Sequence, residues 1–139
     1  MLRAYKYRIY PTEDQKVFLA KTFGCCRFVY NWALNLKIEA YRQEKRSVAY
    51  KEVQDRLVNE LKKENQWLAE VNSQALLNSI RNLDIAYKNF FRDTHAVGFP
   101  RFKSRKNRQS FQCPQHCSID FAKGTITIPK AILWSCHNV

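Results

Sequence analysis

The sequence predicts an α+β fold that is mainly helical, with a helix-turn-helix-like bundle inserted in a small, incomplete β-barrel. Three observations indicate this fold. The chain opens with a strand-like alternation, its middle carries apolar residues at helical spacing, and its last third returns to period-two alternation. With 139 residues, 45% of them hydrophobic, the chain is long enough to bury one core, so we expect a folded domain.

The first element is expected to be a strand over residues 2–9. Tyr5, Tyr7 and Ile9 would share one face of it. Lys6 and Arg8 would share the other, which is typical of a half-buried strand with a basic solvent face. The proline that follows ends this strand.

Two helices about one tight turn are expected next. Thr12 and Gln15 have the spacing of a capping box, which predicts a helix that runs to about Phe23 and stops at Gly24. Apolar residues at helical spacing then predict a second helix that begins at once and runs to about Arg46.

Two further helices complete the helical part. One extends from Tyr50 to Leu61, and Asn72 has the place of an N-cap for the longest helix. Its expected core stripe consists of Leu76, Ile80, Leu83, Tyr87 and Phe90. On another face lies a line of cations, which are Arg81, Lys88 and Arg92. We interpret this line as solvated surface charge unless it adjoins the basic loop that follows.

The densest positive charge of the chain follows Gly98 and Pro100 in the sequence, and these two residues interrupt any helix. Five cations fall within eight residues, namely Arg101, Lys103, Arg105, Lys106 and Arg108. We expect an extended segment that follows a phosphate backbone, with Phe99 and Phe102 stacking on bases or anchoring the loop to the core. The alternative is a solvated basic loop.

Short strands are expected after this loop. Residues 111–113 would form one, and residues 119–121 and 125–128 would form a hairpin about Lys123 and Gly124, closed by Pro129. The first strand is expected to join these late strands in one small sheet or barrel, which would bring the basic strand and the basic loop to one place.

Charge and hydropathy narrow the class of partner. A net charge of +12 favours a polyanion, of which nucleic acid is the commonest. An anionic membrane would favour a basic amphipathic helix, whereas here the densest charge lies in a loop. No apolar run approaches the roughly 18 residues of a membrane span. We therefore expect a cytoplasmic protein without a membrane or small-molecule partner.

We expect neither a metal or other cofactor nor catalytic residues. The residues Cys113, His116, Cys117, Cys136 and His137 fit no established spacing of a structural zinc site, so reduced thiols are the favoured interpretation. The acidic residues mostly sit on helices beside Lys or Arg, as surface ion pairs do, and do not suggest the converging carboxylates of a two-metal nuclease.

Four segments together resemble the N-terminal part of the TnpB (OrfB) proteins of bacterial insertion sequences. They are AYKYRIYPT at residues 4–12, TFGCCRFVYNWAL at 22–34, FPRFKS at 99–104 and KGTITIPK at 123–130. Members of this family were first described as transposases with a helix-turn-helix and later recognised as RNA-guided DNA nucleases. The resemblance covers residues 1 to about 130.

The resemblance implies a wedge-type barrel split by a helical recognition insert. Residues 1–10 would be the first strand of the barrel, 11–97 the insert, 98–130 the basic loop and returning strands, and 131–139 an aberrant tail that departs from the family. In such proteins these parts hold the guide RNA and the target-adjacent DNA. A RuvC-like nuclease domain and a zinc module cut, and the sequence contains no counterpart of either.

The first functional hypothesis is the DNA- and guide-RNA-binding part of a TnpB-type protein associated with transposition and recombination, without its own nuclease site. The alternatives are one half of a split RNA-guided nuclease and an inert frameshifted remnant. The candidate contact residues are Tyr5, Lys6, Tyr7, Arg8, Arg81, Lys88, Arg92, Arg101, Lys103, Arg105, Lys106 and Arg108.

Overall fold

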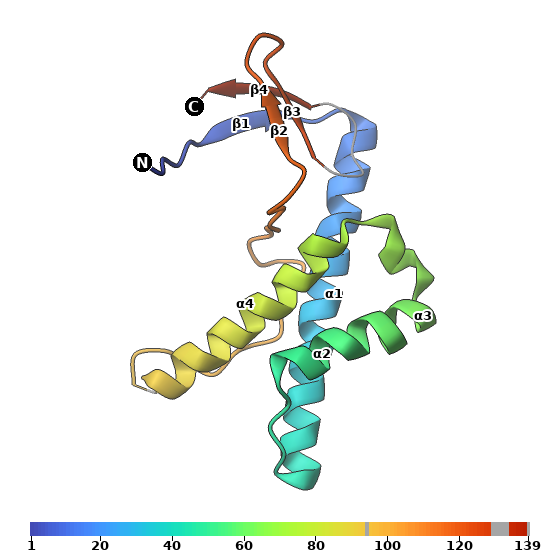
Figure 1. Ribbon diagram of the computed structural model, residues 1–139, viewed down its shortest axis with the longest axis vertical. Coiled ribbons are helices and arrows are strands. Elements are labelled where there is room, and N and C mark those ends of the chain that lie inside the picture. The colour runs from blue at the N-terminus through green and yellow to red at the C-terminus, as the bar shows by residue number, and fades with distance from the viewer. Residues whose placement is uncertain (94, 129–133, 139) are drawn as a thin grey trace.

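The structure, a computed structural model, describes residues 1–93, 95–128 and 134–138, with side chains described as far as residue 128. A layer of crossing helices carries a small antiparallel sheet at one end (Figure 1). The helices are α1 (Glu13–Glu44), α2 (Tyr50–Arg56), α3 (Lys62–Glu64) and α4 (Ser73–Arg92), with a π-helical turn η1 (Leu57–Leu61) and a 3₁₀ turn η2 (Gln66–Glu70). The strands are β1 (Tyr7–Tyr10), β2 (Ser118–Asp120), β3 (Thr125–Thr127) and β4 (Trp134–Asn138).

Helix α1 begins as its sequence predicts. Gln15 Oε1 accepts the Thr12 N–H at 2.8 Å, and Thr12 Oγ1 accepts the Gln15 N–H at 3.4 Å, which completes the capping box. The helix ends at Lys45 in the left-handed conformation, with φ 54°. The Lys45 and Arg46 N–H groups then donate to Tyr41 and Ala40 and satisfy carbonyls of the last turn.

The expected break at Gly24 is wrong, because α1 is one continuous helix of 32 residues. Buried Thr22, Cys26 and Val29 continue one apolar stripe straight through this position. A glycine inside a helix costs about 1 kcal/mol relative to alanine, and the packing of the stripe outweighs that cost. A residue with a Cβ would also fit, since the nearest atom, on Arg27, lies 3.8 Å away.

The segment after α1 is helical from Tyr50 to Glu64, slightly longer than predicted. It runs through α2, η1 and α3 without interruption, and buries Val53, Leu57 and Leu61. Helix α4 confirms its predicted cap, since Asn72 Oδ1 accepts the Gln74 N–H at 2.7 Å.

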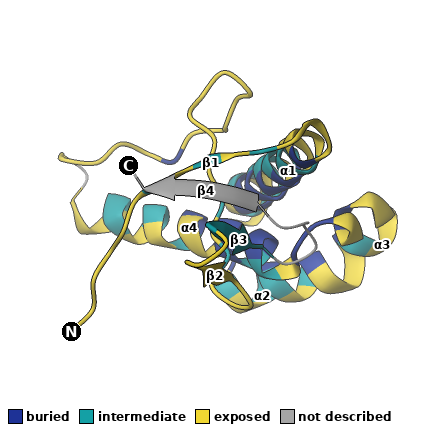
Figure 2. Cartoon of the chain, turned by 90° about the horizontal axis from the view of Figure 1, so that it is seen from above, coloured by how far each residue is buried: buried dark blue, intermediate teal, exposed yellow. Residues whose placement is uncertain are grey.

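The hydrophobic core lies where α1, the 48–61 segment and α4 meet, and buried residues face inward from each of them (Figure 2). Leu76, Ile80 and Leu83 of the predicted α4 stripe are at most 1% exposed, whereas Tyr87 and Phe90 are half-buried at its far end. The helical part is therefore held together chiefly by the crossing of α1 and α4.

The four strands form one antiparallel sheet in the order β1-β4-β3-β2. Helices α1 to α4 lie between β1 and β2 along the chain, so the expectation that the first and the late strands share one sheet is confirmed. The predicted hairpin is present too, with β2 paired to β3 about Gly124, whose φ is 63°. The barrel itself stays a prediction.

Three strand predictions need correction. The first strand covers only Tyr7–Tyr10, and residues 111–113 form no strand, because they run against the helical layer instead. Residues Trp134–Asn138, in which no strand was expected, form β4, which pairs with both β1 and β3. The strand forms although its sequence does not alternate clearly, because its backbone N–H and C=O groups can bond to strands on both sides. The expected departure of residues 131–139 from the family stays a prediction. The predicted closure at Pro129 lies outside the described residues.

Candidate nucleic-acid interface

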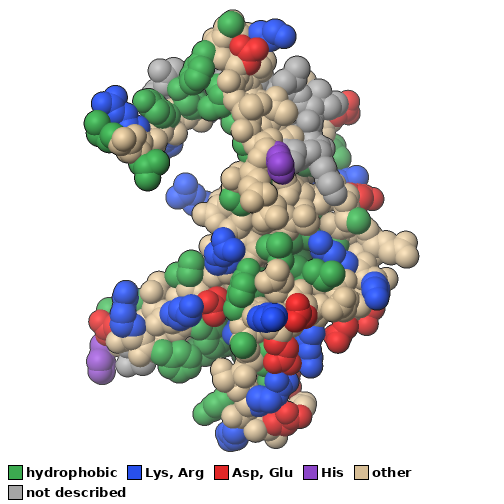
Figure 3. Space-filling model, in the orientation of Figure 1, with side chains coloured by type: hydrophobic (Ala, Val, Ile, Leu, Met, Phe, Trp, Pro, Cys, Tyr) green, Lys and Arg blue, Asp and Glu red, His purple; other side chains and the backbone are tan. Residues whose placement is uncertain are grey.

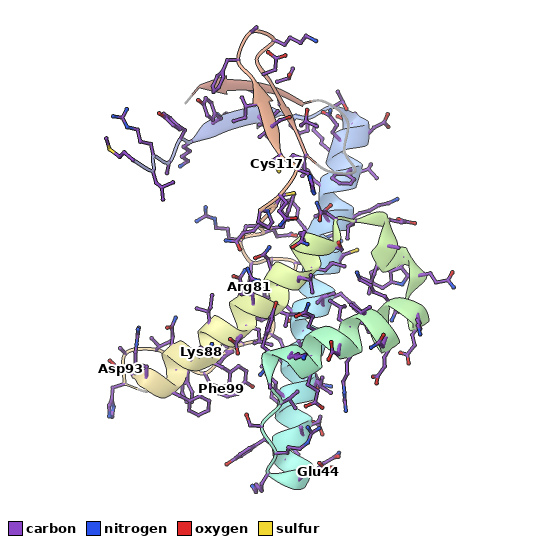
Figure 4. The ribbon with its side chains drawn as sticks, viewed as in Figure 1. Glu44, Arg81, Lys88, Asp93, Phe99 and Cys117 are labelled. Carbon is purple, nitrogen blue, oxygen red and sulfur yellow. The ribbon has the colours of Figure 1, made fainter. Side chains whose placement is uncertain are left out.

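The basic loop, residues 98–112, leaves the end of α4 and returns along that helix to α1 (Figure 1). Phe99 packs edge-on against Tyr87 and Phe90, each with ring centroids 5.4 Å apart, and Pro100 is buried. Figure 4 shows Phe99 beside the C-terminal half of α4. Of the two roles predicted for this residue, the contacts favour the anchor.

An asparagine of α1 holds the middle of the basic loop. Asn31 Nδ2 donates to the Lys103 carbonyl at 2.9 Å, and Asn31 Oδ1 accepts the Lys103 N–H at 2.7 Å. Both backbone groups of Lys103 are thus satisfied by one side chain. The Lys103 ammonium lies 4.4 Å from the centroid of the Tyr30 ring, a cation–π contact, and burial raises the pKa of that tyrosine.

The next residues form a turn, so the extended path predicted for this segment is wrong here. The Asn107 N–H donates to the Ser104 carbonyl at 3.1 Å, and the Lys106 N–H donates to Ser104 Oγ at 3.0 Å. A serine hydroxyl that captures the backbone two residues on favours a turn over an extended chain. The cations therefore project from a compact turn.

The end of the basic loop is fastened to α1 as well. Gln109 Nε2 donates to the Arg105 carbonyl at 3.0 Å, and Gln109 Oε1 accepts from the Arg27 guanidinium at 3.4 Å. Phe111 then packs edge-on against Phe23 with centroids 5.5 Å apart. The loop is held at its start, middle and end, although it has no regular secondary structure.

The charges of the basic loop have no acidic counterpart. Its five cations, Arg101, Lys103, Arg105, Lys106 and Arg108, are all exposed. None of them forms an ion pair with any residue whose side chain the structure describes. The sequence explains this, because residues 95–119 contain neither Asp nor Glu, and residues 1–12 contain none either. An uncompensated positive surface attracts anions.

The cations of the helical part are different. Lys16, Lys21, Arg42, Arg46, Arg56 and Lys88 each lie within 2.9 to 3.5 Å of a Glu or Asp. Hydrogen bonding from Arg46 lowers the pKa of Glu52. These pairs confirm that many acidic residues of the helices serve as surface ion pairs.

The line of cations on α4 is only partly joined to the basic loop. Arg81 and Lys88 are exposed on α4 (Figure 4), and Arg92 is exposed in its last turn. Lys88 pairs with Asp84 at 2.9 Å, as a solvated surface residue does. Asn78 and Asn82, which flank Arg81 on α4, line a cavity together with loop residues, whereas Arg81 itself is not among its lining residues.

The first strand and the basic loop do not coincide as expected. Tyr7 is half-buried, Tyr5 is 70% exposed, and Lys6 and Arg8 are exposed beside the sheet. The sheet lies at one end of the molecule, and the anchored middle of the loop lies at the helix crossing (Figure 1). Figure 3 shows a hollow between the sheet end and the helices, with Lys and Arg side chains on its borders.

The residues that position the basic loop were missed by sequence reasoning. Asn31, Arg27 and Gln109 fix its path, yet each belongs to a polar residue type that is common on protein surfaces. Asn31 stands between Tyr30 and Trp32 on a helix, which offered a weak signal. Nothing in the sequence indicates that its partner lies 72 residues away.

Three cysteines have a thiol pKa above the usual range. Burial raises the pKa of Cys25 to about 11, and that of Cys26 in the same direction. Burial, together with the neighbouring Cys117, raises the pKa of Cys113 to about 12. No group of three or more His, Cys, Asp or Glu converges among the side chains up to residue 128, and those of Cys136 and His137 lie outside the described residues.

Within the described part of the chain, no helix is both long enough and apolar enough to cross a bilayer.

Comparison with known proteins places these features in a family. A family model described as a helix-turn-helix domain, of the OrfB type of insertion sequences, matches residues 1–46. Relatives from Streptomyces pristinaespiralis and Escherichia coli K12 are 37% and 36% identical over 96% and 93% of this chain. Both carry the name "Putative RNA-guided DNA endonuclease", with the addition InsQ in E. coli. The chain spans only 34% and 32% of their lengths.

A third relative is aligned to this chain over almost its whole length. It is "Virulence protein VsdF" of Salmonella dublin, 35% identical over 116 residues, which cover 78% of this chain and 98% of the relative. The region that matches the helix-turn-helix domain contains β1 and α1. It therefore includes Asn31, which holds the basic loop through the Lys103 backbone. The chain therefore belongs to the TnpB (OrfB) family.

Proposed function

We propose that this chain is the nucleic-acid-binding part of a TnpB-type, transposon-associated protein, and that it binds DNA phosphates through the basic loop. The observation that carries the proposal is the state of the five loop cations. They are exposed, they have no acidic partner among the described side chains, and they stand on a backbone that α1 holds in place. Such cations can replace the counterions of a duplex without first breaking an internal ion pair.

The other predicted residues form a second, weaker set of contacts in this proposal. Tyr5, Lys6, Tyr7 and Arg8 would contact nucleic acid from the sheet end, and Arg81, Lys88 and Arg92 from α4. We propose that the sheet belongs to a wedge-type barrel whose strands are separated by the helical insert at residues 11–97. The order of β1 beside β4 supports this division.

We propose that the same surface also accepts guide RNA. The relatives named RNA-guided endonucleases support this extension. A loop that recognises phosphate groups has no intrinsic preference for DNA, since both backbones present them. Competition between a DNA duplex and a structured RNA for the purified protein would test it, and an RNA that fails to compete at low salt would contradict it.

We further propose that this part binds without cutting. Glu13, Glu39, Glu44, Glu52, Glu70 and Asp84 lie against Lys or Arg, which supports a structural role for these acids. Cleavage of DNA by the purified chain in Mg²⁺ would contradict this and favour the nuclease alternative.

The central proposal is tested by the salt dependence of DNA binding. If about five cations contact duplex phosphates, a plot of log affinity against log salt should have a slope near −4 to −5. Neutralising Arg105, Lys106 and Arg108 to Gln should lower the steepness by about three. Filter binding from low to moderate salt measures both.

A matched control removes the same charge from the helical part. Lys51, Arg56 and Lys63 lie on the 50–64 segment and do not belong to the basic loop. Their change to Gln should leave the salt slope near that of the wild type. Equal losses in the two triple variants would show that net charge, and not the loop, binds DNA.

A further inference from the structure

A small polar cavity lies where the basic loop meets the crossing of α1 and α4. Its volume is about 90 Å³. All three elements line it with side chains that include Arg27 from α1, Asn78, Ser79 and Asn82 from α4, and Asn107 and Arg108 from the loop. Two of the loop cations, Lys103 and Arg108, line it together with residues of the helix crossing.

The lining of this cavity has the chemistry of an anion site. Amides, serine hydroxyls, the Lys103 ammonium and two guanidinium groups line it, and none of its lining residues is an Asp or Glu. Asn78 and Ser79 are 7% and 9% exposed, and they donate to the Gln74 and Ala75 carbonyls of their own helix. An anion would therefore be bound chiefly by Asn82 and the cations. A polar cavity of this kind holds water or a hydrogen-bonding ligand, whereas apolar cavities stay dry.

The size of the cavity limits what it can hold. A buried water needs about 10–15 Å³ of such space, so there is room for roughly six waters. A tetrahedral phosphate group has five non-hydrogen atoms and fits that space. A nucleoside is far larger. Phe23 and Phe111 also line the cavity, but they pack edge-on against each other, so size and not the absence of aromatic residues excludes a base.

One of the two guanidinium groups is already oriented. Arg27 donates to Gln109 Oε1, and Gln109 in turn donates to the Arg105 carbonyl. The loop backbone, through Gln109, thus fixes a cation of α1 at the cavity wall. An oriented guanidinium loses less conformational freedom when it binds an oxyanion.

We infer that this cavity seats one phosphate group of the bound nucleic acid. The inference rests on the proposed function, and it names the point at which one phosphate enters the protein instead of lying on its surface. Asn82 of α4 and Arg108 of the loop would then donate to the same oxyanion, so binding would also tighten the loop against the helices.

Asn82→Asp tests the seat, because it places a carboxylate at the cavity with almost no change in shape. Asn82 is exposed, so the folded state should persist, which a melting curve can verify. DNA affinity should fall about tenfold, the loss expected for a charge-assisted hydrogen bond, and the salt slope should weaken by about one. Asn59→Asp adds the same charge on exposed surface of the 50–64 segment and should change affinity less than twofold.

A second measurement does not depend on DNA. Inorganic phosphate, titrated into the ¹⁵N-labelled protein, should shift the side-chain amide signals of Asn78 and Asn82 in a saturable way. Asn107→Asp should abolish the shift of Asn78, and Asn59→Asp should keep it.

The outcomes separate this inference from the proposed function. If the wild type binds DNA with a steep salt slope but Asn82→Asp behaves as Asn59→Asp does, the phosphate seat is overturned and DNA binding stands. If the wild type fails to bind DNA while phosphate still shifts Asn78, the proposed function falls and the anion site stands. Absence of a saturable shift in the wild type overturns the seat directly.

Discussion

The helical part and the sheet differ in how they bury their residues. The hydrophobic core runs from Cys25 to Leu83, and every member of it belongs to the helices or their short connections. In contrast, β2 is exposed throughout, and neither β1 nor β3 contains a buried residue. The sheet is thus an appendage to a helical core, as far as the described side chains extend.

The helical part also differs in charge from the basic loop and residues 1–12. In the helices, acidic residues lie within reach of many cations, whereas the basic loop and residues 1–12 contain no acid at all. The net charge of +12 therefore says less than its distribution. One region supplies stability and the other supplies free positive charge, and this division can be tested residue by residue.

The largest expected effect separates the core from the sheet. Leu76→Ala should lower the free energy of unfolding by about 2–5 kcal/mol, because Leu76 is fully buried and its loss leaves a cavity. Ile119→Ala should cost about 0.5 kcal/mol or less, because Ile119 is 41% exposed on β2. Urea denaturation followed by circular dichroism measures both. Equal losses would show that the sheet is part of the core.

The next effect concerns the anchor between the two regions. Asn31→Ala removes both hydrogen bonds to the Lys103 backbone and should lower the unfolding free energy by about 1 kcal/mol. Its main consequence should be local, as faster trypsin cleavage between residues 103 and 108. Asn35→Ala, one turn further along α1 and exposed, is the matched control. Unchanged proteolysis would mean that the aromatic contacts alone hold the loop.

A smaller effect distinguishes one long helix from a helix-turn-helix. Gly24→Ala should raise the free energy of unfolding by about 0.5–1 kcal/mol, since alanine is the better helix former and its Cβ meets nothing closer than 3.8 Å. Thermal melting measures the change. A loss of stability would instead indicate a turn at this position that only glycine tolerates.

The last effect is a pH dependence within the core, which does not change stability near neutral pH. Burial raises the pKa of the Cys25 thiol from 9.0, the value in an unfolded chain, to about 11 in the folded protein. Between these pH values the thiol loses its proton in the unfolded chain but keeps it in the folded one, which favours unfolding. The unfolding free energy should therefore fall as pH rises from about 9 to about 11. Cys25→Ala should flatten that decline, measured by urea denaturation at several pH values. Val29→Ala destabilises the same helix without a titrating group and should keep the wild-type decline.

Local signals predicted the elements well. The capping box at Thr12, the cap at Asn72 and the hairpin about Gly124 depend on residues a few positions apart, and all three are present. The break predicted at Gly24 failed because the packing of a buried stripe, which involves α4, outweighed a local preference. Strand β4 was missed because pairing with two distant strands creates it.

The candidate interface was predictable in composition but not in shape. The five loop cations and their lack of acidic neighbours can be read from the sequence. The turn at Ser104 is held by local hydrogen bonds, whereas the anchor at Asn31 and the cavity beneath the loop require contacts across tens of residues. No periodicity in the sequence encodes such contacts.

The bond pattern of Asn31 has a consequence for how this surface can diverge. Because the amide grips main-chain atoms, the path of the loop does not depend on which side chain position 103 carries. Lysine there can be exchanged for a neutral or larger residue while the neighbouring cations keep their places. Substitutions at position 103 can thus change the charge of the loop without changing its path.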